Sequence, residues 1–145
     1  MRAERPAPLW RRAAAGLLDA ALGFSAAALG ALWLVTALAL LRPGAPDAAR
    51  VLVLAGAIAG LSVALHVVYH VGFVWGCGQT PGAMALGIAV ASADGRAPGP
   101  WRAGARLLGG WLALLALGLP HAVPLLAGER RGFGDWLAGT WMVRT

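Results

Sequence analysis

Charged residues are scarce in this sequence. Only 12% of its 145 residues are charged, whereas 59% are hydrophobic, and the mean hydropathy is +0.71. Soluble globular domains carry about 25% charged residues, so this scarcity argues against a soluble domain. The composition is typical of an integral membrane protein, whose first partner is the lipid bilayer.

Lysine is absent and cysteine is nearly so. All twelve basic residues are arginines, and six acids oppose them, which leaves a net charge of +6. The sequence shows no basic helix face interleaved with aromatic residues, so we expect the positive surplus to meet an anionic membrane surface and not a nucleic acid. The single cysteine, Cys77, excludes a disulfide within the chain.

Long apolar runs are what the sequence has in abundance. Three stand out, over residues 13–41, 51–75 and 107–126, and each supplies the roughly 20 residues that a membrane-crossing helix needs. The first run is longer than the apolar core of a signal peptide, about 7–15 residues, and it contains Asp19, so we expect it to be retained as a helix. The predicted fold is a single all-α membrane domain over residues 1–145.

The third apolar run belongs to a broken helix that we expect over residues 101–126. Pro120 and Pro124 each remove a helix hydrogen bond that lipid cannot replace. This segment either crosses the membrane with a kink or turns back as a re-entrant hairpin. A Gly/Pro-rich loop over residues 76–100 precedes it, and a short interfacial segment over residues 133–145 follows it.

The arginines indicate which side of the membrane each end occupies. By the positive-inside rule the side richer in arginine is cytoplasmic, which places the N-terminus and the loop 76–100 there. Trp10, Trp75 and Trp101 all fall at this same interface, as in an aromatic belt. The arginines on this side are Arg2, Arg5, Arg11, Arg12, Arg96, Arg102 and Arg106, against Arg42 and Arg50 in the turn after the first run.

Asp19 is a carboxylate inside an apolar run. A charged Asp at the centre of a membrane helix costs about 2.5–3.5 kcal/mol, so we expect it to have a partner. Arg106 enters the third run from the same side at similar depth, and we predict that it pairs with Asp19. We also predict that Asp135 docks against Arg12, which requires a cytoplasmic C-terminus. The alternative for Asp135 is that it only caps its own segment.

Small residues recur near this acid. Gly16, Gly23 and Gly30 are spaced by seven in the first run, and Gly56 and Gly60 by four in the second. Small residues at such spacing let membrane helices approach closely. We expect close helix packing through them, although glycine is abundant in the chain as a whole.

The segment Gly78-Gln79-Thr80-Pro81-Gly82 is a candidate binding loop. Thr80 suits an N-cap and Pro81 suits the first helical position, so a short helix is expected to begin here. Its amides would suit an anion, but the sequence lacks the GxxxxGKS pattern of a phosphate loop. A structural turn is therefore favoured.

Candidate metal-binding and catalytic residues are few. His66 and His70 stand four apart, a spacing that can offer two imidazoles to one metal, but no third ligand lies near them in the sequence. The sequence arranges no nucleophile beside a base and no paired carboxylates for catalysis. We expect no metal, no other cofactor and no enzymatic activity.

Several motifs, taken together and in order, resemble the RDD family of small bacterial membrane proteins over nearly the whole chain. They are Trp10-Arg11-Arg12, Asp19, GQTPG at 78–82, Gly87-Ile-Ala-Val90, Asp94-Gly95-Arg96, Arg106-Leu-Leu and Gly134-Asp135-Trp-Leu-Ala-Gly-Thr140-Trp-Met-Val143. The family is named for one arginine and two aspartates, which the resemblance places on Arg12, Asp19 and Asp135. Family members usually have a lysine after the PG pair, where this chain has Ala83. The resemblance implies a multi-pass protein of the bacterial inner membrane, in a family that has been linked to transport.

Two functions remain open at this point. In one, an internal clamp of Asp19 and Arg106 holds together a structural or assembly subunit, which works with copies of itself or with another membrane protein. In the other, Asp19 belongs to a proton or cation path through an oligomer. Three helices enclose little space, which favours the first function or an oligomer.

Overall fold

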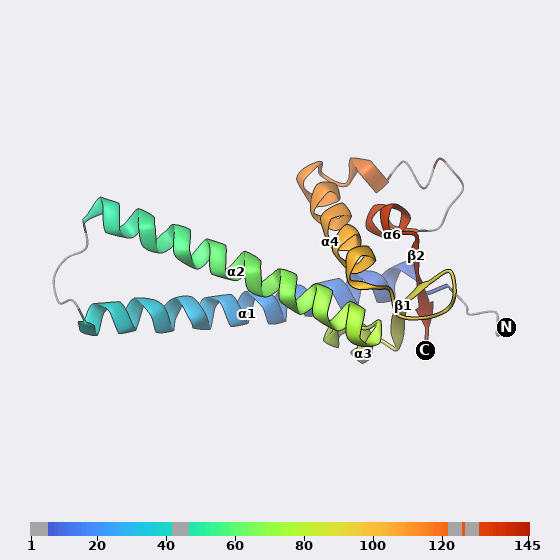
Figure 1. Ribbon diagram of the computed structural model, residues 1–145, viewed down its shortest axis with the longest axis horizontal. Coiled ribbons are helices and arrows are strands. Elements are labelled where there is room, and N and C mark those ends of the chain that lie inside the picture. The colour runs from blue at the N-terminus through green and yellow to red at the C-terminus, as the bar shows by residue number, and fades with distance from the viewer. Residues whose placement is uncertain (1–5, 42–46, 122–125, 127–130) are drawn as a thin grey trace. The chain divides into compact units, whose positions relative to one another are not determined.

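The structure, a computed structural model, describes residues 6–41, 47–121, 126 and 131–145 (Figure 1). These residues form two compact units, residues 20–66 and residues 1–19 with 67–145, and the second is called the junction unit below. In chain order the elements are α1 (Leu9–Leu41), α2 (Ala48–Cys77), α3 (Pro81–Ala85), β1 (Ile88–Ser92), α4 (Pro100–Leu115), η1 (Leu119–His121), α6 (Phe133–Ala138) and β2 (Thr140–Arg144).

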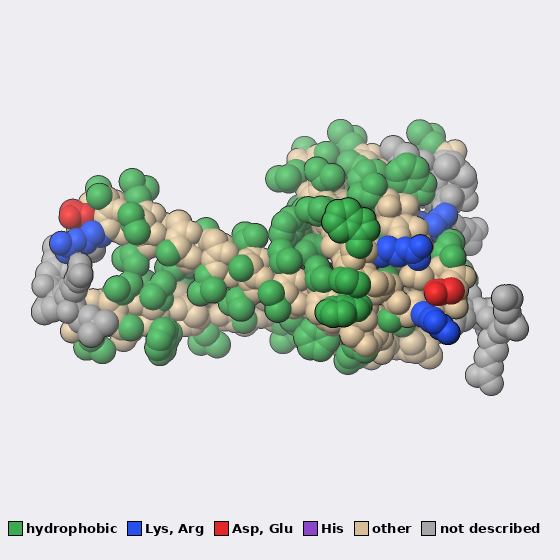
Figure 2. Space-filling view, viewed as in Figure 1, with side chains coloured by type: hydrophobic (Ala, Val, Ile, Leu, Met, Phe, Trp, Pro, Cys, Tyr) green, Lys and Arg blue, Asp and Glu red, His purple; other side chains and the backbone are tan. Residues whose placement is uncertain are grey.

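Two long apolar helices dominate the chain. α1 has 33 residues and α2 has 30, and both are long and apolar enough to cross a membrane. At 1.5 Å per residue they measure roughly 50 Å and 45 Å, more than the roughly 30 Å of a bilayer's hydrocarbon core. Large apolar side chains such as Phe24, Trp33 and Leu52 are exposed on them. Figure 2 shows hydrophobic side chains on the surface along both helices. A helix that is apolar all round and exposed is suited to lipid.

Both helices begin earlier than the apolar runs alone indicated. α1 starts at Leu9 instead of residue 13, directly after Pro8, and α2 starts at Ala48 instead of residue 51. Asp47 opens α2, because its side chain accepts a hydrogen bond from the amide of Arg50 at 2.7 Å. The predicted turn over residues 42–47 lies outside the described residues except for Asp47.

The glycines of α1 and α2 do not pack as expected. A Cβ atom built on Gly30, Gly56 or Gly60 would meet no atom of the described chain within 4 Å. Gly23 is different, since its Cβ would lie 3.8 Å from Nδ1 of His66. Within the described single chain, most of these small residues therefore face open space.

The junction unit contains a two-stranded antiparallel ribbon that the all-α prediction missed. β1 pairs with β2 from Ile88 opposite Arg144 to Ser92 opposite Thr140. The amide of Ala7 donates to the carbonyl of Met142 at 2.8 Å, which fastens the start of the chain to the same ribbon. Each strand has only five residues, and the two strands are separated by about fifty residues in the sequence. No local sequence pattern therefore predicted the pairing. The core beneath it is formed by Ala7, Ala15, Val74, Ala83, Ile88, Val90, Ala103 and Met142.

The segment that we expected as a broken helix over residues 101–126 begins as α4. α4 ends at Leu115, and Leu117 and Gly118 then take positive φ angles of 53° and 82°. The helix ends in a Schellman motif, in which the amides of Leu117 and Gly118 donate to the carbonyls of Leu114 at 3.1 Å and Ala113 at 2.7 Å. Pro120 follows this turn within the short helix η1. The second proline, Pro124, lies outside the described residues.

α6 packs across α4 through two glycines. A Cβ on Gly109 would lie 2.7 Å from Cα of Gly134, and a Cβ on Gly134 would lie 3.2 Å from the amide nitrogen of Gly110. Any larger side chain at this crossing would push the two helices apart. The crossing brings the segment after α4 back against it and leads into β2.

Candidate functional site

Asp19 lies at the point where α1, α2 and α3 meet in the junction unit. Its carboxylate is 5% exposed and accepts three hydrogen bonds. Tyr69 Oη donates to Oδ1 at 2.8 Å, Thr80 Oγ1 donates to Oδ2 at 2.5 Å, and the amide of Gly82 donates to Oδ1 at 2.8 Å. Hydrogen bonds to an ionised acceptor are stronger than neutral ones, so these donors compensate the burial of the acid without a cation.

The GQTPG segment builds half of this site. Thr80 is the N-cap of α3, with its Oγ1 accepting from the amide of Ala83 at 3.3 Å, and Pro81 occupies the first turn, which confirms the predicted cap. The first amides of a helix favour an anion, and here the amide of Gly82 meets the Asp19 carboxylate. The anion that this loop suits is therefore a side chain of the same protein.

Gly82 permits this contact because it has no side chain. A Cβ at this position would overlap the carbonyl oxygen of Ala15 and would lie 2.8 Å from Oδ1 of Asp19. The neighbouring Gln79 ties the loop to the ribbon, since its Nε2 donates to the carbonyl of Ile88 at 2.9 Å. The GQTPG loop is thus held against α1 by Gly82 and against strand β1 by Gln79.

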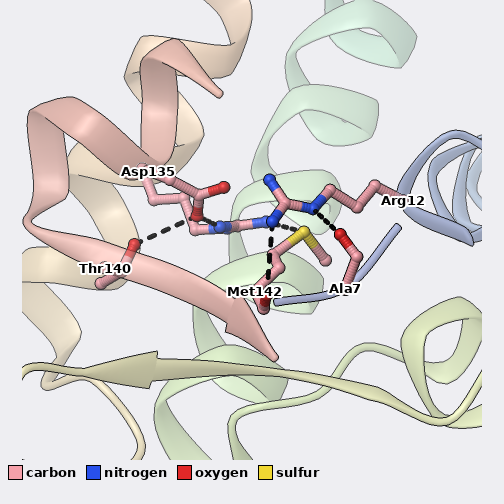
Figure 3. A network of polar contacts seen from close by, with 6 residues as sticks. Ala7, Arg12, Asp135, Thr140 and Met142 are labelled. Carbon is pink, nitrogen blue, oxygen red and sulfur yellow. Dashed lines mark hydrogen bonds and ion pairs between the residues drawn. The ribbon is translucent and has the colours of Figure 1, made fainter. Parts of the chain in front are cut away.

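A second buried carboxylate lies where α4, α6 and β2 meet (Figure 3). Asp135, in the first turn of α6, is 5% exposed and forms an ion pair with Arg106 of α4. Thr140 Oγ1 donates to Asp135 Oδ1 at 3.2 Å, and Arg106 Nη2 lies 3.4 Å from Sδ of Met142. Burial and the nearby positive charge of Arg12 lower the pKa of Arg106 to about 10, so this arginine stays protonated at neutral pH.

Arg12 belongs to the same network as Asp135 (Figure 3). Its Nε donates to the carbonyl of Ala7 at 3.0 Å, and its Nη2 donates to the carbonyl of Met142 at 3.3 Å. The guanidinium therefore links the segment before α1 to strand β2. Arg12, Asp19 and Asp135 all lie in the junction unit.

The predicted partner of Asp19 is wrong. Asp19 does not pair with Arg106, because the donors of α2 and α3 surround it and the crossing of α4 with α6 holds Arg106 against Asp135. Asp135 forms an ion pair with Arg106, which the sequence analysis did not predict. The prediction that Asp135 and Arg12 lie close together, in one network, nevertheless agrees with the structure.

Three contributors were missed from the sequence. Tyr69 is the only tyrosine of the chain, and a lone phenol in an apolar helix needs a hydrogen-bond partner, which was a usable signal. Thr140 and Met142 both lie in the last of the motifs that carry the family resemblance, but nothing in the sequence indicated their contacts with Asp135 and Arg106. Among the residues that the structure describes, no three His, Cys, Asp or Glu side chains gather as metal ligands would.

One known protein family matches the chain over nearly its whole length. The family model described as "RDD family" matches residues 6–139, a range that contains both buried acids and both arginines of the site. No curated protein and no solved structure gives a significant match. With two helices long and apolar enough to cross a membrane and a family match over nearly its whole length, the chain belongs to the RDD family.

Proposed function

We propose that this protein is a structural or assembly subunit of a membrane, in which α1 and α2 cross the bilayer and the buried charges hold the junction unit together. The observation that carries the proposal is the three hydrogen bonds accepted by Asp19, from Tyr69, Thr80 and Gly82. All three donors come from the same chain. A buried acid bonded in this way stabilises the packing of α1 against α2 and α3.

The second acid supports the same interpretation. Asp135 is paired with Arg106 and Thr140, and Arg12 donates to two backbone carbonyls. A proton or cation that passed through either carboxylate would have to displace these contacts. An assembly role requires no such displacement.

The proposed topology places both described ends of the chain on one side of the membrane. β2 pairs with β1, and Ala7 donates to Met142, so the segments before α1 and after α6 lie in one unit. α4 is followed by a turn and by α6 packed against it, which supports the re-entrant alternative for the third run. The arginine distribution supports a cytoplasmic location for this side, and membership of the family supports an inner-membrane location.

Transport through an oligomer is the alternative function. It is favoured by one observation, the open space around Gly56 and Gly60, since small residues spaced by four commonly line contacts between membrane helices. A second copy packed there would enclose a path that one chain does not.

Reconstitution in proteoliposomes separates the two functions. We expect wild-type protein and Asp19→Asn to show the same low proton and cation flux, while Asp19→Asn loses thermal stability and monodispersity. Asp47→Asn is the matched control, because Asp47 is exposed and pairs only at the surface with Arg50. Flux through the wild type that Asp19→Asn abolishes without loss of stability would establish the transport function instead.

A further inference from the structure

Helix α4 has one face buried and the opposite face uncovered. Ala103, Leu107, Gly109 and Ala113 are buried, and Gly109 meets Gly134 of α6. This face is fully used within the junction unit.

The uncovered face is entirely apolar. Trp101, Leu108, Leu112 and Leu115 follow one another at intervals of seven, four and three residues, which places them on a single side of the helix. All four are exposed, from 52% at Leu112 to 86% at Trp101. Figure 2 shows hydrophobic side chains gathered over this part of the molecule.

Polarity changes along the length of α4. Its first turn carries Trp101 and Arg102, both exposed and both suited to the headgroup region. Its last turn and the segment after it carry exposed leucines on more than one side, namely Leu114, Leu117 and Leu119. A helix whose tip is apolar all round is suited to being surrounded by acyl chains at that end.

The neighbours of α4 point to the same environment. The junction unit also contains the first turns of α1 and the last turns of α2, which belong to the two candidate membrane spans. Arg96, Arg102 and Arg144 are exposed in the described part of this unit, against Asp94 as its exposed acid. Such a surplus is attracted to anionic headgroups.

The length of α4 limits how far it reaches. Its 16 residues measure roughly 24 Å at 1.5 Å per residue, short of the roughly 30 Å of hydrocarbon, and the chain turns at Leu117 and Gly118. From these observations we infer that α4 is embedded in one leaflet only. Trp101 and Arg102 lie at the headgroups, and Leu108, Leu112, Leu115 and Leu119 contact acyl chains. The inference rests on the proposed membrane insertion of α1 and α2.

Site-directed spin labelling in lipid vesicles that contain anionic lipid tests this placement. Cys77→Ser provides the background, and Leu108→Cys, Leu112→Cys and Leu115→Cys carry the label on the uncovered face. Phe24→Cys, on the exposed surface of α1, reports lipid, and Ala93→Cys, in the exposed turn after β1, reports water. Collision rates with oxygen and with a water-soluble nickel chelate are measured at each position.

We expect the ratio of the oxygen collision rate to the nickel-chelate collision rate to be several-fold higher at all three α4 positions than at Ala93. This ratio should also rise from Leu108 to Leu115. A ratio at Leu112 equal to that at Ala93 would show that the face is in water and would overturn the inference. Low collision rates with both reagents would also overturn it, because they would mean that protein covers this face; dipolar broadening between labels would then identify a second copy as the cover. A water-like ratio at Phe24 would instead contradict the membrane insertion of α1, and with it the proposed function.

Discussion

The amide of Gly82 donates a hydrogen bond of 2.8 Å to the carboxylate of Asp19, sixty-three residues earlier in the chain. The contact exists because the backbone of α3 approaches α1 so closely that a Cβ on Gly82 would overlap the carbonyl oxygen of Ala15. The hydrogen bond between Gly82 and Asp19 therefore requires both the acid in α1 and a glycine at this position of the loop.

Gly82→Ala should therefore destabilise the junction unit. Overpacking a tight contact costs about 1–3 kcal/mol, and the substitution would also stretch the bond to Asp19. Thermal unfolding of the purified protein in detergent measures the loss. Gly30→Ala is the control, since its Cβ meets no described atom within 4 Å and alanine favours a helix interior over glycine by roughly 0.5–1 kcal/mol. Equal stability of Gly82→Ala and wild type would contradict the close approach.

The ion pair of Arg106 with Asp135 should behave as a unit. Removing one partner of a buried pair costs about 3–5 kcal/mol, because it leaves an uncompensated charge. We expect Arg106→Gln and Asp135→Asn each to be strongly destabilised and the double variant to lose less than the sum of the two. The exposed pair of Asp47 and Arg50 is the comparison, where single neutralisations should cost about 0.2–1 kcal/mol. Additive losses at Arg106 and Asp135 would mean that the two residues do not interact.

Thr80 has two tasks, capping α3 and donating to Asp19. Thr80→Val keeps the shape of the side chain and removes both, so we expect a loss of at least the roughly 1 kcal/mol typical of an N-cap. Thr80→Ser retains the hydroxyl and should remain close to wild type. Circular dichroism during thermal unfolding provides the measurement, and a Thr80→Ser variant as unstable as Thr80→Val would show that the methyl group, and not the hydroxyl, is what matters.

Reporter fusions at the two ends test the topology. Because β2 pairs with β1 and Ala7 bonds to Met142, fusions before Pro6 and after Thr145 should report the same compartment, the cytoplasm. A reporter in the turn between α1 and α2 should report the opposite side. If the C-terminal fusion were external and the N-terminal fusion cytoplasmic, the third run would have to cross, and the pairing of β1 with β2 could not form in the membrane.

The amino-acid sequence by itself determined the features that depend on local chemistry. The apolar runs specify α1 and α2 because a helix satisfies its own backbone groups in lipid, whatever lies beside it. Thr80 and Pro81 specify the start of α3 because capping involves only the next few residues. The family resemblance likewise followed from motifs that stand in the sequence.

Only the tertiary structure decided which charges meet. The sequence predicts that Arg106 and Asp19 lie at a similar depth in the membrane. Similar depth does not determine which side chains are neighbours, because helices at the same depth can face different ways. The neighbour of Arg106 is set by the glycine crossing of α4 with α6, and the donors of Asp19 are set by the return of α3 against α1. The ribbon of β1 and β2 joins segments about fifty residues apart, each too short to show its own period. These contacts depend on long-range backbone approach, which one sequence does not reveal.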